Sequence, residues 1–324
     1  MKKIFKFLFA PFIWLIQACS PLGSPVDEKI SNSHFYNNSK TDIIYSPNGN
    51  WFELEATNLQ VDIASFKVLS NKFGKDNDNI YYLGQAAQNT GIDIQSFNTK
   101  EVAWMWHIGF DKNNAYIFER EVVEGKFKSK ATIIKGANPI TFTQLNQYFS
   151  KDDKNYFFDY KMINVDYSTF KQINKSFHLD KSQAYYHTYQ LFKSFEVDQN
   201  SFKKLDDYYA YDKTNIYYFA EYVRNRGEKK LQIIPYSDFE NVTAYNKTHL
   251  KVNDKVFYKG FEIKDIDISS FTIIDEEHAK DKNHVYFTGV LIKEADPETF
   301  HYSEKVYRYK DKNNTFLQGE IVKK

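Results

Sequence analysis

Internal repetition constrains the fold of this chain more than any other feature of its sequence. An Asp-Lys pair, followed within a few residues by a short aromatic run, recurs along its 324 residues. The clearest copies begin at Asp111, Asp180, Asp212, Asp281 and Asp311, weaker copies begin at Asp76, Asp152 and Asn246, and a degenerate first copy spans residues 39–45. Most copies lie roughly 30–40 residues apart, so the sequence predicts a tandem array of about eight units.

A second landmark lies about ten residues before most of these copies. It consists of an Asp, two or three further residues, and Ser or Thr followed by Phe, as in Asp198…Ser201-Phe202 and Asp267…Ser270-Phe271. The two landmarks together resemble the DKNYY repeat family of bacterial envelope and secreted proteins, as the segments DKNNAYIF, DKTNIYYF and DKNHVYFTG illustrate. The resemblance covers residues 39–324, and it implies a repeat domain without implying a biochemical activity.

Local residue preferences predict that each unit is built from β-strands. Asp and Asn in Asp-Lys-x-Asn favour a turn, and the β-branched and aromatic residues that follow favour a strand, as in residues 215–219. A break at Gly260 or Gly289 then leads to a second alternating stretch, which completes a hairpin. We therefore expect an all-β protein: a tandem repeat of β-hairpins or short meanders, with two or three strands per unit. An elongated, twisted array is favoured over a closed propeller, because a propeller blade uses about 40–45 residues.

The first residues are typical of a secretory signal. Lys2, Lys3 and Lys6 precede an apolar stretch at 7–16, which is too short for a membrane span. The stretch ends in Ile16-Gln17-Ala18-Cys19, which resembles the bacterial lipobox, and Cys19 is the one cysteine of the chain. The resemblance implies a signal peptide at 1–18, an acylated Cys19 with a flexible tether at 19–38, and a repeat domain at 39–324. The alternative is an ordinary cleaved signal with an incidental cysteine.

Localisation and charge narrow the classes of partner. Acyl chains on Cys19 would anchor the protein to a membrane, and Ser20 after the cysteine favours the outer membrane of the cell envelope. The 43 basic and 42 acidic residues nearly balance, which argues against a nucleic-acid partner.

The motifs that would indicate catalysis or a cofactor are missing from the sequence. It has no nucleotide-binding glycine loop and no zinc-protease or serine-hydrolase motif, so we expect no catalytic residues, no metal and no cofactor. The acidic turns could instead be calcium loops, but a Lys usually follows the Asp and the closing Glu is absent. His278 and His284 could hold a metal, although they occupy variable positions of an ordinary repeat.

Two insertions that break the repeat pattern are candidate partner contacts. Trp104 and Trp106 lie in the first, and Arg224 and Arg226 lie in the second. Aromatic residues and Arg are enriched at binding surfaces, but the same residues also suit a core strand and a solvated hairpin tip. The sequence favours a non-catalytic module that binds an envelope protein, with neutralisation of a periplasmic toxin as one hypothesis. A glycan- or wall-binding module is the alternative, and an envelope hydrolase is a third.

Overall fold

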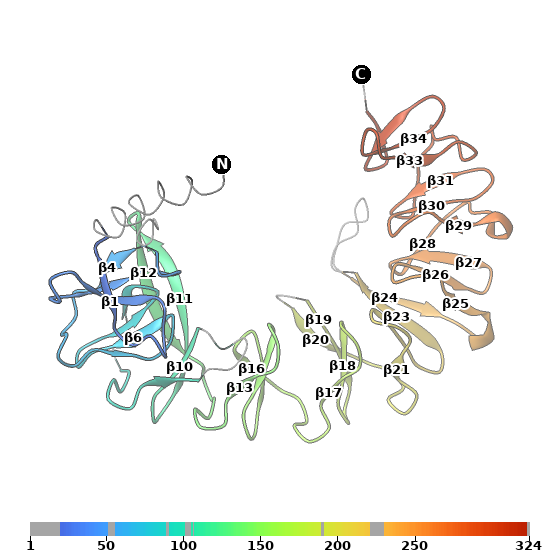
Figure 1. Ribbon diagram of the computed structural model, residues 1–324. Helices are drawn as coiled ribbons and strands as arrows, with labels where there is room; N and C mark the ends of the chain where they lie inside the picture. The colour runs from blue at the N-terminus through green and yellow to red at the C-terminus, as the bar shows by residue number, and fades with distance from the viewer. Residues whose placement is uncertain are drawn as a thin grey trace, which may run out of the picture. The chain divides into compact units, whose positions relative to one another are not determined.

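In its described residues, the protein is built from short β-strands and turns, with two single-turn 3-10 helices (Figure 1). The computed structural model describes residues 20–50, 56–88, 91–100, 105, 107–188, 191–220 and 230–322. These residues belong to two compact units, 1–164 and 165–324. Within the described part, neither helix has the length or the apolar character needed to span a bilayer. The all-β prediction is confirmed.

The described strands of the first unit form four meanders, which we number repeats 1 to 4. Repeat 1 contains β1 (Leu22–Pro25), β2 (His34–Asn37), β3 (Ile43–Tyr45) and β4 (Thr57–Asn58). Repeat 2 contains β5 (Lys67–Val68), β6 (Phe73–Lys75), β7 (Ile80–Tyr82) and β8 (Gln85–Gln88). Repeat 3 contains β9 (Asn98–Thr99), β10 (Ile108–Phe110), β11 (Ala115–Val123) and β12 (Lys126–Ile133). Repeat 4 contains β13 (Thr143–Gln144), β14 (Phe149–Lys151), β15 (Tyr156–Phe158) and β16 (Lys161–Ile163).

The described strands of the second unit form repeats 5 to 9. Repeat 5 contains β17 (Lys171–Gln172), β18 (Phe177–Leu179), β19 (Ala184–His187) and β20 (Phe192–Phe195). Repeat 6 contains β21 (Lys203–Lys204), β22 (Tyr209–Tyr211), β23 (Asn215–Ala220) and β24 (Lys230–Pro235). Repeat 7 contains η1 (Phe239–Asn241), β25 (Val242–Ala244), β26 (His249–Val252), β27 (Lys255–Tyr258) and β28 (Phe261–Glu262). Repeat 8 contains η2 (Ile268–Ser270), β29 (Thr272–Ile273), β30 (His278–Lys280), β31 (Val285–Phe287) and β32 (Val290–Leu291). Repeat 9 contains β33 (His301–Ser303), β34 (Arg308–Lys310), β35 (Thr315–Leu317) and β36 (Glu320–Ile321).

Each repeat is a four-stranded antiparallel sheet whose strands pair in chain order. The prediction of two or three strands per unit was wrong, because the first strand of most repeats is too short to show a hydrophobic period; β5, for example, has two residues. In addition, β8 and β12 pair in parallel, which joins repeats 2 and 3 into one eight-stranded sheet.

The prediction of a flexible tether at residues 19–38 also needs correction. β1 and β2 lie in this segment and pair with each other, and β2 pairs with β3. Ser31, Ser33 and His34 are buried, and the Ser33 hydroxyl donates a hydrogen bond of 2.9 Å to the Pro47 carbonyl. Ser24 and Pro25 lie in β1, and the Ser31 hydroxyl accepts the backbone N–H of Ser33, so these residues belong to the folded repeat 1. The degenerate copy at 39–45 is therefore the central hairpin of a complete repeat, and the described array has nine repeats.

The hydrophobic core lies between consecutive repeats. In the first unit, Phe73 and Tyr82 of repeat 2 share a cluster with Phe97 and Phe118 of repeat 3, and the Phe73 and Phe118 ring centroids are 4.8 Å apart. In the second unit, one cluster contains buried residues of repeats 6, 7 and 8. A single short meander buries little apolar surface by itself, so neighbouring repeats stabilise one another through these aromatic layers.

Glycine turns allow the repeats to approach closely. The third and fourth strands of repeats 2, 7, 8 and 9 are joined by two residues with positive φ, the second of which is Gly84, Gly260, Gly289 or Gly319. A Cβ on Gly289 would lie 2.8 Å from Tyr258 of the preceding repeat, and one on Gly319 would lie 2.8 Å from Phe287. A side chain at this position would therefore clash with the aromatic residue below it.

The weak copy at Asn246 belongs to a different turn from the other copies. Its side chain accepts hydrogen bonds from the backbone N–H groups of Thr248 and His249, just before β26. Asp206 and Asp275 hold the corresponding turns of repeats 6 and 8. The turn between β26 and β27 is instead shortened to Asn253 and Asp254. The sequence register was wrong here because Asx turns occur at two places in repeats 4, 5, 6 and 8.

Candidate functional site

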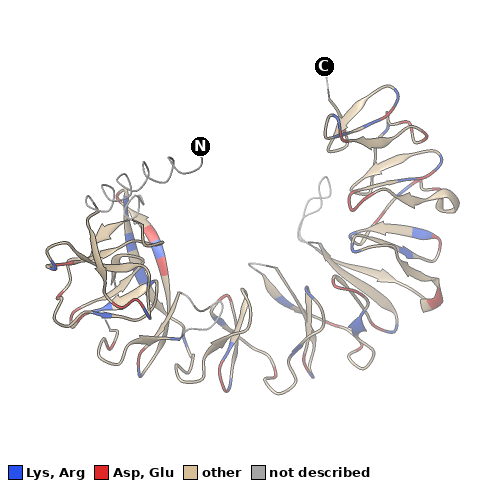
Figure 2. Cartoon of the chain, viewed as in Figure 1, with Lys and Arg blue, Asp and Glu red and all other residues tan. Residues whose placement is uncertain are grey.

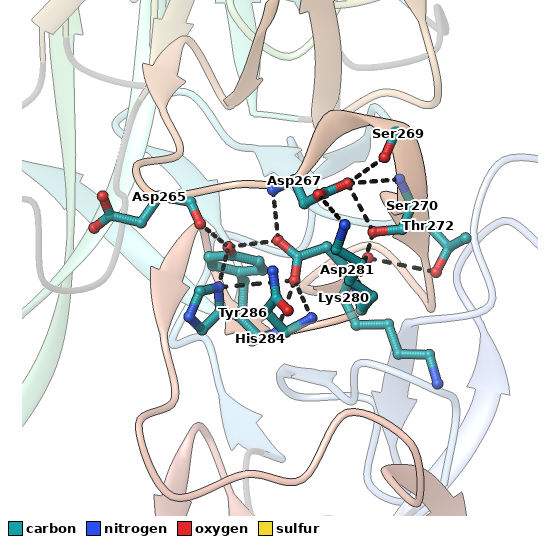
Figure 3. Close-up of polar contacts among 11 residues, drawn as sticks. Asp265, Asp267, Ser269, Ser270, Thr272, Lys280, Asp281, His284 and Tyr286 are labelled. Atoms are coloured by element: carbon teal, nitrogen blue, oxygen red, sulfur yellow. Dashed lines mark hydrogen bonds and ion pairs between the residues drawn. The ribbon is translucent and has the colours of Figure 1, made fainter.

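In repeats 2 to 6, 8 and 9, the repeated Asp accepts hydrogen bonds within the turn between the second and third strands. In repeat 8, Oδ1 of Asp281 accepts the backbone N–H groups of Asn283 and His284 at 2.8 and 2.7 Å (Figure 3). Its Oδ2 accepts the backbone N–H of Asp267 at 2.8 Å and the Tyr286 hydroxyl at 3.0 Å. One buried carboxylate therefore ties together the turn, the following strand and the upstream segment.

The repeated Lys joins the two sequence landmarks from the solvent side. The Lys282 backbone N–H donates to the Ser270 hydroxyl at 3.0 Å, and the Lys282 Nζ lies 2.7 Å from Oδ2 of Asp267. Repeats 3, 5, 6 and 9 have the same ion pair, formed by Lys112 and Asp93, Lys181 and Asp166, Lys213 and Asp198, and Lys312 and Asp296. The two landmarks are thus two halves of one polar network.

Electrostatics indicate that this network is structural. Burial alone would raise the pKa of Asp281, but hydrogen bonds from the Asp267 and Asn283 N–H groups and from the Tyr286 hydroxyl outweigh burial, so its pKa is lowered. Four donors already face the carboxylate, where a calcium ion would need its oxygens. Among the described residues, no group of three or more His, Cys, Asp or Glu side chains is placed to hold a metal. The Asp-Lys residues therefore stabilise the repeats.

Repeat 4 replaces both members of the ion pair at once. Asp153 occupies the position of the Lys, and Asn138 occupies the position of the upstream Asp. The Asp153 Oδ1 accepts the Thr141 hydroxyl at 2.8 Å and the Asn138 Nδ2 at 2.9 Å. The two replacements compensate each other. With a carboxylate at the Lys position, the upstream position holds a neutral hydrogen-bond donor in place of a second carboxylate.

This compensation leads to a testable expectation in repeat 6. Lys213→Asp should lower the urea midpoint slightly, because it removes the exposed 2.6 Å ion pair with Asp198 and places two carboxylates side by side. Adding Asp198→Asn should restore most of the loss by recreating the Asn138–Asp153 pair of repeat 4. Urea unfolding of the single and double variants measures both effects. A double variant no more stable than Lys213→Asp would contradict the interpretation.

The junction of repeats 3 and 4 departs from the repeat pattern at both of its contact positions, Ile117 and Tyr160. A pocket of about 540 Å³ lies there, between the hairpin β11–β12 and the turn that joins β15 to β16. Its apolar walls include Ile117, Ile133, Ile134 and Met162. Ile133 and Met162 are 44% and 53% exposed, so the apolar surface continues out of the pocket. Such a concave, mainly apolar site suits binding of an apolar group.

Tyr160 forms one side of this pocket in an unusual conformation. It occupies the place of the glycine in the two-residue turns described above, with φ of +59°, which is rare for a bulky residue. Its hydroxyl lies 2.5 Å from Nε2 of His107, in a hydrogen bond that links repeat 4 to repeat 3. Burial raises the pKa of Tyr160 and lowers the pKa of His107 to about 4, so both groups are neutral at pH 7.

The insertion that contains the tryptophans leads into the same junction. Met105 is 1% exposed and belongs to the core cluster against which Ile117 and Tyr160 pack. This placement makes Met105 a core residue and His107 a contact of the pocket wall. Trp104 and Trp106, which the sequence suggested as contacts, lie outside the described residues, as do Arg224, Arg226 and Cys19.

Sequence reasoning missed the residues that form the pocket. Ile117 follows the repeated Tyr116, at a position where other repeats have Tyr82, Tyr218 or Phe287. Alignment of the units on their Asp-Lys pairs would have shown the missing aromatic residue, and alignment on their glycine turns would have shown Tyr160.

A second pocket, of about 510 Å³, lies in the other unit, and three of the charged residues that line it pair with one another. Asp207 is bound by Lys175 at 3.1 Å and by Lys204 at 2.7 Å. Because these charges are paired at an exposed surface, this pocket offers less to a ligand than the apolar one.

Comparison with known proteins identifies the repeats and adds nothing on activity. A sequence model described as the DKNYY family matches residues 36–189 and 192–320. Neither the curated proteins nor the solved structures contain a match to this chain.

Proposed function

This chain belongs to the DKNYY family, and from that premise we propose that it is a lipid-anchored protein of the cell envelope that binds a protein partner without catalysis. The observation that carries the binding role is the apolar pocket between repeats 3 and 4, with Ile133 and Met162 half-exposed at its mouth. Exposed Met side chains are adaptable contacts at protein-binding surfaces.

The non-catalytic role is supported by the use of the polar residues. The repeated Asp and Lys side chains take part in the networks that hold each repeat together, as Asp281 and Lys282 do in repeat 8. A catalytic pair would instead be expected at one place in the chain, with groups left to contact a substrate.

The anchor is supported by the sequence around Cys19 and has a geometric consequence. β1 begins at Leu22, so Ser20 and Pro21 alone separate Cys19 from the first repeat. With acyl chains on Cys19, repeat 1 would be held at the membrane surface, and the outer membrane is the destination we propose.

In-cell crosslinking of the tagged full-length protein, followed by mass spectrometry, tests the proposal. We expect one dominant envelope protein, lost from the membrane fraction with Cys19→Ser and captured at least tenfold less by Met162→Asp. Ile321→Asp is the matched control, because Ile321 occupies the corresponding position of repeat 9 and is 40% exposed.

Other outcomes would overturn parts of the proposal. Equal capture by Met162→Asp and Ile321→Asp would move the contact away from the pocket. Wall fragments or polysaccharide in place of a protein would favour the glycan-binding alternative, with Trp104 and Trp106 as the next residues to replace. Turnover of a glycan or peptide by the purified protein would favour a hydrolase.

A further inference from the structure

The pocket forms because two facing positions at one junction both hold residues that differ from those of the other junctions. Repeats 2, 7, 8 and 9 each place a turn glycine against a side chain of the preceding repeat. A Cβ on Gly84, for example, would lie 2.7 Å from the Tyr45 ring. At the junction of repeats 3 and 4, the lower position holds Ile117 and the turn position holds Tyr160. A Tyr cannot approach as closely as a Gly, and an Ile fills less space than a Tyr or Phe.

The hydrogen bond to His107 holds the Tyr160 ring at one side of the pocket. The Tyr160 side chain packs against the core cluster that contains Met105, and its hydroxyl is hydrogen-bonded to His107 Nε2. A positive φ is unfavourable for Tyr, so the packing of Tyr160 against this buried cluster must maintain its backbone conformation. Tyr160 is therefore a positioning residue that keeps the junction open.

The charged residues around the pocket indicate which kind of chemical group it can bind. Lys135 and Lys161 contribute two positive charges, and Glu119 and Asp159 contribute two negative charges. The Lys161 Nζ lies 3.8 Å from Oδ2 of Asp159, and both side chains are largely exposed. Figure 2 shows that acidic and basic residues are also interspersed along the hairpin β11–β12. A rim with balanced charge favours an uncharged group in the pocket, and it offers partners of both signs to the residues on either side of that group.

We infer that the pocket receives an uncharged aromatic or long aliphatic side chain of a protein partner, and that Tyr160 and Ile117 together create the room for it. This inference rests on the proposed function and names the contact through which it operates. The apolar surface beyond the mouth, at Ile133 and Met162, favours a polypeptide over a small molecule, because it would be covered by the residues next to the inserted side chain.

The methionines provide a direct test. The chain has three, at positions 1, 105 and 162, so methyl-labelled methionine gives one signal from the mouth of the pocket and one from the core beneath it. We would titrate the full-length protein with N-acetyl-tryptophanamide, an uncharged indole side chain with peptide-like ends. We expect a saturable ring-current shift of Met162, assigned with Met162→Leu, and no saturable shift with N-acetyl-lysinamide or N-acetyl-glutamate.

Two variants should close the pocket from opposite sides. Tyr160→Gly restores the glycine turn of repeats 2, 7, 8 and 9, and Ile117→Phe restores the aromatic residue that such a glycine contacts, so each should weaken binding at least tenfold, or by about 1.4 kcal/mol. Tyr160→Phe keeps the ring and should still bind. The Met105 signal reports whether each variant is folded, and a folded Ile117→Phe decides the question if Tyr160→Gly is not.

The outcomes separate this inference from the proposed function. Absence of a saturable shift, an equal shift with the charged probes, or unchanged binding in both closing variants would overturn the pocket assignment. If crosslinking still captures one envelope protein, the binding function stands and its contact lies elsewhere. A saturable Met162 shift without a captured protein would support the pocket and contradict the proposed partner class.

Discussion

Asp212→Ala is expected to destabilise repeat 6 by about 3–5 kcal/mol. Asp212 is 2% exposed, and its carboxylate accepts the backbone N–H groups of Thr214 and Asn215 at 2.9 and 2.8 Å. It also accepts the Asp198 N–H at 3.0 Å and the Tyr217 hydroxyl at 2.7 Å. Alanine leaves these donors without their acceptor. Hydrogen exchange of the Thr214 and Asn215 amides measures the local loss.

Tyr217→Phe is the matched control for this experiment. It removes one of the four donors and should cost about 1 kcal/mol. Repeats 4 and 9 already have Phe157 and Phe316 at this position, so the ring fits without its hydroxyl. Equal losses in Asp212→Ala and Tyr217→Phe would show that the carboxylate does not organise the repeat.

The second large effect is loss of stability on mild acidification. Burial lowers the pKa of four histidines from 6.5 to about 4, at positions 34, 107, 187 and 249, and lowers the pKa of His178 to about 3. The unfolded chain binds a proton at each site below about pH 6.5, whereas the folded chain does not until about pH 4. Stability should therefore fall as the pH is lowered through this window.

The expected size follows from the cost of about 1.4 kcal/mol per pKa unit. Between pH 7 and pH 5, each of these histidines should cost roughly 2 kcal/mol, in both units of the chain. Urea unfolding at the two pH values measures the loss. His249→Phe should reduce the pH dependence of the second unit. A midpoint that does not move between pH 7 and pH 5 would contradict the prediction.

Residue patterns predicted the repeated part of the fold well, for a physical reason. Asp281 and Tyr286 are recognisable in sequence because Asp281 has four hydrogen-bond donors within 14 residues, Tyr286 among them, so the repeats that keep this network keep similar residue types at nearly the same spacing. Pairs such as Lys67–Val68, by contrast, form a strand only because β6 lies beside them. Isolated residues of this kind show no period, and for that reason the first strand of each repeat was not distinguished from the second, and β1 and β2 of repeat 1 were missed.

The candidate site was harder to predict, because it depends on the absence of an aromatic residue and of a turn glycine that other junctions have. Ile117 is an ordinary strand residue, and Tyr160 is one of 25 tyrosines. They become informative only when each is compared with its counterparts in the other repeats, a comparison that requires the correct register. The residues that were proposed as contacts were chosen for being unusual types, whereas the pocket is built from common types in unusual positions.

The short span of the polar network has a consequence for the order of folding. Its bonds in repeat 8 join residues 5, 12 and 14 apart, so a repeat can close its network soon after synthesis, at a small loop-entropy cost. Repeat 2 is different, because the edge of β8 is completed by β12, and the Ser129 hydroxyl bonds the Tyr82 carbonyl 47 residues away. The nascent chain must therefore leave this edge open until repeat 3 has emerged. Repeats 2 and 3 then complete their folding as a pair.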